Sequence, residues 1–489
     1  MSDKGLKFKT NWCLRKTIFL VFCGIAHLSL LALEPPATRK YFRSDAGIAH
    51  SADSLPDNLE ATELLRWRVD LDVGHSTPIL HGGRIFLTTW RPESKELATV
   101  ALDEENGRLL WRGAIKPERI EQTHAIGSPA TGTVACDGSH IFAFFGSAGV
   151  LCYDLDGHKI WEQRLGPFRD EYGAGSSPIL CGDKVILNQD HDTDSFLIAL
   201  DCATGRVAWK VPRPDAVRSY STPVVWNQNG QPEILVAGAL QLSAYNPVDG
   251  QRLWWVNGLA RIVIPTPVPA GDMIYMASWS PGGDPAKRLE LDPWNRPISK
   301  WDKNRDGKLA KNEIEDREVI ERFNRMDLDA DGLLNQSEWE HHAAYFKRAQ
   351  NAILALKPAG RGELSEAALV WKYSRGVPYV ATPVLDRGIL WMVKEGGIVT
   401  KLDATTGRLL QEERVPGFGN YFASPVAGDN KIYFASESGT VSVVAAGQGW
   451  RVISSRDFHE KIYATPALNR GRFFLRTDQA LYCFHGTRP

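Results

Sequence analysis

This sequence has few cysteines, little net charge and almost no long apolar runs. Only 7 of its 489 residues are cysteine, none adjacent and none spaced C-x-x-C, so no disulfide framework or cysteine-based metal site is indicated. Its 57 basic and 58 acidic residues leave a net charge of -1, and this balance does not favour nucleic acid or an anionic membrane surface. A single apolar run, at the N-terminus, excludes a polytopic membrane protein. What is abundant is 43 Gly, 28 Pro and 16 Trp, which indicates many turns and many buried aromatics.

The N-terminal 33 residues resemble an export signal. Basic residues from Lys4 to Lys16 precede an apolar run over 17–33, and Glu34-Pro35-Pro36 ends it. A cleaved signal, a retained anchor and a cytoplasmic protein all remain open. Either of the first two places the body outside the cytoplasm, in the periplasm or at the cell surface, with membrane contact only through this segment. Residues 34–60 are interpreted as a linker.

A Ser/Thr-Pro pair precedes a short apolar strand eight times. Seven of the eight units fit one period, because successive prolines lie 41 to 51 residues apart except for one gap of 116. Four short strands per unit of this length are typical of a β-propeller blade. The pairs are Thr77-Pro78, Ser128-Pro129, Ser177-Pro178, Thr222-Pro223, Thr266-Pro267, Thr382-Pro383, Ser424-Pro425 and Thr465-Pro466.

A second motif recurs at a fixed position within the repeat units. Its clearest copy runs from Ala199 to Trp209 and places a turn with Asp201 and Gly205 before a strand carrying the tryptophan. Asp and Gly suit tight turns, and a tryptophan four residues later can wedge between adjacent sheets. The last unit lacks this tryptophan strand, whereas Trp67 precedes the first unit without a blade of its own. We therefore expect the N-terminal strand to complete the eighth blade.

These features predict an all-β fold, an eight-bladed β-propeller. The Ala199–Trp209 copy matches the tryptophan-docking consensus A-x-D-x-x-T-G-x-x-x-W, and residues 60–486 resemble the quinoprotein (PQQ)-like propeller repeat family. That family includes quinone-dependent alcohol dehydrogenases and cofactor-free scaffolds such as the outer-membrane assembly lipoprotein, so the resemblance implies a fold and leaves the function open. We assign the propeller to 61–279 and 351–486, with an insertion over 280–350 in the fifth blade.

The insertion contains two twelve-residue segments that resemble EF-hand calcium loops. Carboxylate or amide at positions 1, 3 and 5, glycine at 6, a carbonyl at 7 and glutamate at 12 supply the oxygens that calcium prefers. The loops start 25 residues apart, closer than in a usual pair, so whether they pair face to face stays open. Two calcium ions are expected, held by Asp302, Asn304, Asp306, Lys308 and Glu313, and by Asp327, Asp329, Asp331, Leu333 and Glu338.

Two functions compete for the hub of the ring. The resemblance implies that a quinone enzyme carries a vicinal disulfide, a stacking tryptophan, a catalytic aspartate and a hub calcium. This chain has no adjacent cysteines, and its calcium loops lie outside the repeats, so no catalytic residue is assigned and PQQ is not expected. We interpret the chain as a calcium-binding scaffold for a protein partner, with a PQQ-dependent or other hub-active oxidoreductase as the alternative.

Aromatic, histidine and arginine residues stand just before the Ser/Thr-Pro pairs. Equivalent positions on eight blades converge on one end of the channel, and these residue types are common in recognition surfaces. Ordinary blade-entry residues remain the competing interpretation. The candidate ligand-binding residues are His75, His124, Tyr172, Arg218, Tyr220, Arg261, Tyr379, Tyr421 and Tyr463.

Overall fold

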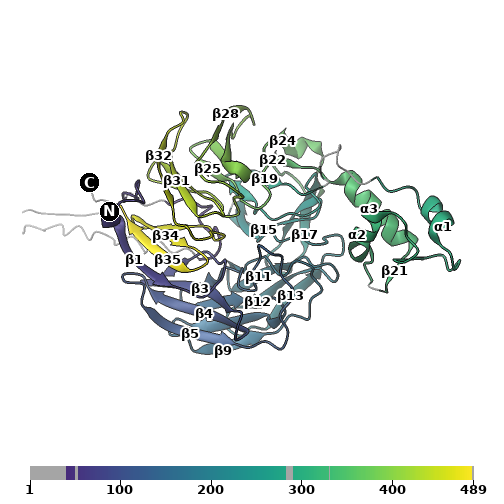
Figure 1. Cartoon of the computed structure of the whole chain (residues 1–489), viewed down its shortest axis with the longest axis horizontal. Coiled ribbons are helices and arrows are strands. Elements are labelled where there is room, and N and C mark those ends of the chain that lie inside the picture. Colours follow the sequence, from purple (N-terminus) through teal and green to yellow (C-terminus); the bar gives the residue numbers. More distant parts are fainter. Residues whose placement is uncertain are drawn as a thin grey trace, which may run out of the picture. The chain divides into compact units, whose positions relative to one another are not determined.

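In the part of the chain that the structure describes, eight sheets form a closed ring (Figure 1). Seven have four antiparallel strands, and the fourth blade gains a fifth strand, β23 (Gly362–Glu363), which pairs parallel with its outermost strand. The computed structural model describes residues 40–49, 53–228, 230–281, 283, 290–329 and 331–486. The N-terminal 33 residues, for which we predict an export signal, therefore lie outside the described residues. Within those residues no helix is both long and apolar enough to cross a membrane.

The first four blades follow the chain in order from the hub outward. Their strands are β2 (Ile79–His81), β3 (Arg84–Arg91), β4 (Glu96–Asp103), β5 (Leu109–Ile115); β6 (Ala135–Cys136), β7 (His140–Phe144), β8 (Val150–Asp154), β9 (Lys159–Gln163); β10 (Ile179–Cys181), β11 (Lys184–Gln189), β12 (Phe196–Asp201), β13 (Val207–Pro212); β14 (Val224–Gln228), β15 (Gln231–Gly238), β16 (Gln241–Tyr245) and β17 (Arg252–Asn257).

The second four blades include the insertion and the closing strand. Their strands are β18 (Val268–Ala270), β19 (Met273–Ser278), β22 (Ala352–Leu356), β24 (Leu369–Tyr373); β25 (Val384–Asp386), β26 (Ile389–Lys394), β27 (Ile398–Asp403), β28 (Leu409–Arg414); β29 (Val426–Gly428), β30 (Lys431–Ala435), β31 (Thr440–Ala445), β32 (Val452–Asp457); β33 (Ala467–Asn469), β34 (Arg472–Arg476), β35 (Ala480–His485) and β1 (Leu65–Asp70).

The N-terminal strand β1 closes the ring, as predicted. It pairs antiparallel with β35, Trp67 opposite Cys483, and Figure 1 shows it beside the C-terminal strands. Its indole packs against Gly107 of the first blade and donates a hydrogen bond to the Glu104 carbonyl at 3.3 Å. The last and first blades are therefore joined by both a backbone ladder and a side-chain wedge.

The same wedge joins most neighbouring blades. The indole Nε1 groups of Trp111, Trp161, Trp209 and Trp371 each donate to a carbonyl of the next blade at 2.8 to 3.0 Å. In the sixth blade, where the tryptophan position is Gln411, the buried Lys401 ammonium donates instead to the Gln448 and Gly449 carbonyls at 2.7 and 2.9 Å.

Replacement of a docking glycine is expected to destabilise the ring. Gly205 has φ +70°, and an added Cβ would lie 2.5 Å from Trp161, whereas Gly182 has φ +60° with nothing within 4 Å. Gly182→Ala should cost about 1–2 kcal/mol for left-handed backbone strain, and Gly205→Ala about 2 kcal/mol more for overpacking. Urea unfolding of both variants measures the difference, and equal losses would show that the wedge tolerates a methyl group.

A ring of hydroxyl groups explains the Ser/Thr-Pro repeat. The backbone N–H of one blade's Ser or Thr donates to the hydroxyl of the next, which satisfies buried polar groups around the hub. The second blade departs from the predicted pattern, because Thr133 takes this position and Ser128-Pro129 lies in a preceding turn closed by Thr131. The bonds run from Thr77 to Thr133 (2.9 Å), Thr133 to Ser177 (3.0 Å), Ser177 to Thr222 (3.0 Å), Thr266 to Thr382 (2.9 Å), Thr382 to Ser424 (2.9 Å) and Ser424 to Thr465 (3.0 Å).

The insertion lies between the second and third strands of the fifth blade. It comprises α1 (Asn295–Trp301), α2 (Arg317–Met326), α3 (Gln336–Arg348) and the short strands β20 (Leu309–Ala310) and β21 (Leu333–Leu334). Its own core includes Val319, Phe323 and Met326 of α2. Among the described residues, single-turn 3-10 helices also occur at Thr62–Leu64, Gly146–Ala148, Glu366–Ala368 and Glu395–Gly397.

Candidate functional site

The mouth of the hub holds a cavity of about 490 Å³. The wall is built the same way in every blade. In each one, the residue two positions before the Ser or Thr of the hydroxyl ring lines the cavity. In extended chain such residues share a face with the hydroxyl residue and so point to the same side. These eight residues are His75, Thr131, Gly175, Tyr220, Ile264, Val380, Phe422 and Tyr463.

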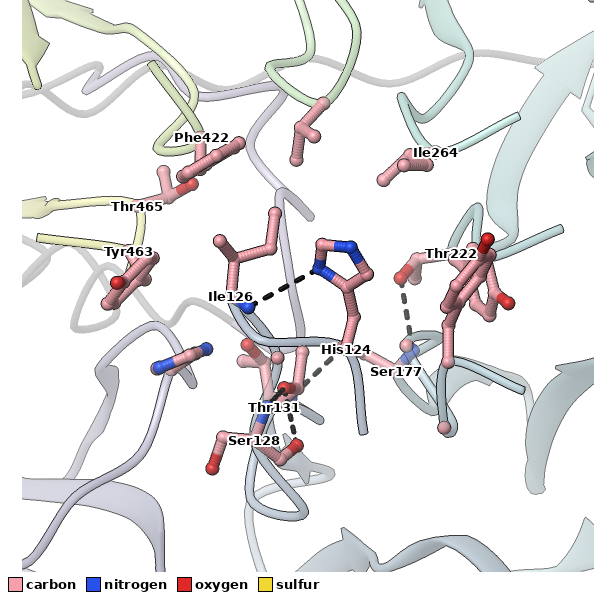
Figure 2. A pocket seen from close by; sticks show the side chains of 18 of the residues that line it. His124, Ile126, Ser128, Thr131, Ser177, Thr222, Ile264, Phe422, Tyr463 and Thr465 are labelled. Carbon is pink, nitrogen blue, oxygen red and sulfur yellow. Dashed lines mark hydrogen bonds between the residues drawn. The ribbon is translucent and has the colours of Figure 1, made fainter. Parts of the chain in front are cut away.

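Six of the nine predicted ligand-binding residues line this cavity: His75, His124, Tyr172, Tyr220, Tyr379 and Tyr463. Figure 2 shows Ile126, Ile264 and Phe422 around the His124 ring. Sequence reasoning missed Ile126, Ile264 and Phe422. Counting two positions back from each Ser or Thr of the hydroxyl ring would have identified Ile264 and Phe422.

The other three predicted residues lie elsewhere. Tyr421, one position out of phase, is 4% exposed, and its hydroxyl donates to the Pro416 carbonyl at 3.0 Å. Arg218 and Arg261 line a separate, smaller cavity between the blades and the insertion. The hub cavity therefore takes the histidines and four of the five tyrosines of the predicted set, whereas both arginines line the second cavity.

The hub cavity is aromatic and uncharged. No Asp, Glu, Lys or Arg belongs to the wall that the structure describes. His75 stacks on Tyr463 with ring centroids 4.3 Å apart, and burial together with the Arg476 guanidinium lowers the pKa of His75 to about 3. Burial and the Glu437 carboxylate raise the pKa of Tyr463 to about 12, so both side chains are neutral near pH 7.

A segment N-terminal to the closing strand crosses the channel. The Lys40 carbonyl accepts from Cys136 N in the second blade at 2.7 Å, and Ile48 forms a parallel bridge with Ala427 in the seventh. Between them, Arg43 donates to the Pro383 carbonyl at 2.8 Å and Phe42 joins the cavity wall. The composition of this segment did not predict these contacts.

The two acidic loops of the insertion pair face to face. Strands β20 and β21 are antiparallel, with Leu309 opposite Leu334, which answers the question that the short spacing left open. Gly307 and Gly332 have φ near +82° and +81°, as the sharp turn at position 6 requires. The single helix α2 connects the loops, leaving the first and entering the second.

Side-chain oxygens converge in the second loop. One oxygen each from Asp327, Asp329 and Glu338 lies within 4.8 Å of the others, and the buried Asp327 Oδ1 has no hydrogen-bond partner. In the first loop, Glu313 Oε1 accepts from Lys303 N at 3.1 Å and so reaches back to the loop start. A carboxylate oxygen buried without a donor suits a cation ligand, so the residues present fit calcium.

The insertion contacts the hub mouth. Arg325 on α2 donates to the Tyr172 hydroxyl at 3.0 Å and forms an ion pair with Glu171 at 3.1 Å. Tyr345 on α3 donates to the Asp215 carbonyl at 2.7 Å. The insertion therefore packs on the third and fourth blades as well as joining the fifth.

Comparison with known proteins connects this geometry to one family. The family model described as "Outer membrane protein assembly factor BamB" matches residues 96–261 and 345–487. The assembly factor BamB of Yersinia pestis is 22% identical over 456 residues, which cover 88% of this chain and 98% of that protein. The crystal structure of BamB from Moraxella catarrhalis superposes with a TM-score of 0.52 at 16% identity, over 86% of this chain and 96% of the other, and shows a shared fold.

Oxidoreductases also match. The quinohemoprotein alcohol dehydrogenase ADH IIB of Pseudomonas putida is 22% identical over 243 residues, 48% of this chain. The match spans only 31% of that enzyme's length. Sequence similarity alone therefore does not choose between scaffold and enzyme.

Proposed function

Because this chain belongs to the outer membrane protein assembly factor BamB family, we propose that it is an exported propeller scaffold that binds a protein partner at the hub mouth. The uncharged aromatic cavity is the observation that carries the proposal. Aromatic side chains anchor protein interfaces when apolar groups of a partner fill the space between them. The cavity has the volume of a typical ligand site and takes wall residues from all eight blades.

The same wall does not fit a quinone cofactor of the related dehydrogenases. It has no carboxylate among its described residues to hold a calcium ion or act as a base, and no cation to meet an acidic cofactor. The five cysteines in the described part of the chain are all free thiols, and none is adjacent to another. We therefore expect no dye reduction with alcohols or sugars after addition of quinone and calcium.

Photo-crosslinking in the native cell envelope tests the scaffold proposal. A photoreactive residue at Ile264, inside the cavity, should form one discrete adduct with a protein partner. The matched control is Phe418, which is 88% exposed and lies outside the cavity. Phe422→Glu in the chain that carries the probe should reduce the adduct at least about tenfold, because a buried charge would face apolar groups. Equal adducts from both positions, or an adduct unaffected by Phe422→Glu, would contradict hub-mouth binding.

The proposal includes two calcium ions in the insertion. They would be held by the loops 302–313 and 327–338, with the carbonyls of Lys308 and Leu333 at position 7. When bound, calcium supplies a charge that neutralises clustered carboxylates and fixes the loop ends. Glu313 and Glu338, both buried, would each supply two oxygens.

Substitution of these glutamates tests calcium binding. We expect calorimetry to give two calcium ions per chain, and one ion in either Glu313→Gln or Glu338→Gln. The double variant should bind none tightly, because a neutral amide replaces the charged carboxylate that binds calcium through both oxygens. Glu340→Gln, on the exposed side of α3, is the control and should keep two. Removal of calcium with a chelator should lower the helix content of the insertion and allow proteolysis within 300–345, while the ring stays folded. A flat titration would contradict the proposal.

A further inference from the structure

Three arginines meet where the insertion packs on the propeller. Arg218 follows β13, Arg261 follows β17, and Arg325 lies in the last turn of α2. All three line one cavity of about 40 Å³, together with His341 and His342 of α3. The hub mouth proposed above is a different cavity, so this site is considered separately.

Two of the arginines have carboxylate partners and the third has none. Arg218 pairs with Asp192 at 2.5 Å and with Glu171 at 2.7 Å, and Arg325 pairs with the same Glu171 at 3.1 Å. Arg261 has no ion pair with any described residue; its guanidinium lies 5.0 Å from the Phe346 ring centre, and its buried Nε has no hydrogen-bond partner. Arg261 is partly buried, and a charge taken out of water without a counter-charge is costly, so Arg261 is a cation without an anion among the described residues.

The electrostatics support the same conclusion. Burial, with the charges of Arg325 and Arg218, lowers the pKa of Arg261 to about 10, so it stays charged at neutral pH. Burial and the Arg261 charge lower the pKa of His342 to about 3. The Nε2 atoms of His341 and His342 are buried and also lack partners. A neutral imidazole can donate one N–H, so these rings can complete a cradle for an anion.

We propose that this cavity binds one small anion, held by Arg261 with the flanking Arg218, Arg325 and the two histidines. A cavity needs about 10–15 Å³ to hold one water molecule. The cavity therefore fits a chloride ion, a small oxyanion or one carboxylate group, and is too small for a larger organic ligand. Charge-assisted hydrogen bonds from guanidinium make such binding strong.

Anion binding at this site does not depend on calcium binding in the acidic loops. Asp327, the first residue of the second acidic loop, lines the same cavity but forms no ion pair with Arg261 among the described residues. If calcium takes up the Asp327 carboxylate, the remaining cavity becomes more cationic. Measurements in calcium and in chelator therefore separate the two proposals, because a failed calcium titration leaves the effect of Arg261 on anion binding intact.

Chloride NMR line broadening on the full exported chain tests the site. Wild type should broaden the chloride signal saturably, and Arg261→Gln should lower the affinity at least about tenfold, because it removes a charged donor. Arg317→Gln is the control, since Arg317 lies 90% exposed on the same insertion. Arg261→Lys, which keeps the charge, should retain part of the broadening and covers the case that the glutamine variant fails to fold.

Competition then identifies the source of the anion. Displacement of chloride by acetate supports a carboxylate occupant, and displacement by phosphate alone supports an inorganic oxyanion. Broadening of equal strength and saturation in wild type and in a folded Arg261→Gln would overturn the proposal. So would broadening that Arg317→Gln abolishes and Arg261→Gln preserves.

Discussion

Deletion of residues 60–70 is expected to destabilise the whole propeller rather than its last blade alone. The deletion removes β1, leaves β35 with an unpaired edge, and takes away the Trp67 indole that packs on Gly107 of the first blade. Loss of a packed tryptophan alone costs about 3–5 kcal/mol, and an open edge invites pairing with other chains. We expect a lower, broader thermal transition and concentration-dependent aggregation.

A point substitution separates the wedge from the ladder. Trp67→Ala keeps the backbone pairing of β1 but removes the indole, so it should lose about half or more of the stability that the deletion loses. Phe418→Ala, at an 88% exposed position, should change nothing. An unchanged melting temperature in the deletion variant would contradict closure by β1.

Substitution of Asp190 should be among the most damaging single changes in the ring. Its carboxylate is fully buried and accepts from Arg213 Nε at 2.7 Å and Nη2 at 3.0 Å, while Arg213 also donates to the Tyr245 hydroxyl. Asp190→Ala leaves the guanidinium buried without a counter-charge, which costs about 3–5 kcal/mol. The loop after Arg213 carries the Asp215 carbonyl that receives Tyr345 of α3, so the insertion should also loosen.

The double variant Asp190→Ala/Arg213→Met distinguishes a stranded charge from a lost packing contact. With both charges removed, most of the stability should return, because a buried pair is worth little over apolar replacements. Asp292→Ala breaks the exposed pair with Arg296, whose side chains are 60% and 71% exposed, and should cost under about 1 kcal/mol. Urea unfolding followed by tryptophan fluorescence measures all of these variants. A double variant as unstable as Asp190→Ala would contradict the argument.

The sequence alone determined the features that recur locally. Blade number, the closing role of Trp67 and the position of the insertion all follow from repeats with a fixed period, because each blade packs mainly on its neighbours and needs the same turn and wedge each time. The acidic loops were visible for the same reason, since twelve consecutive residues carry the whole pattern.

Tertiary structure decided what depends on residues from several blades. In the hydroxyl ring, Thr133 takes the position that the repeat assigns to Ser128. In the sixth blade, Lys401 contacts the next blade where the other blades use a tryptophan. In both cases the side chain that makes the contact is the one whose position in the fold lets it reach the partner. Tyr421 and Phe422 differ by one residue, yet only Phe422 lines the hub cavity, since adjacent residues in extended chain point to opposite sides. The insertion's helices cover Arg218 and Arg261 and place them in a second cavity, a contact between segments far apart in sequence that no local pattern carries.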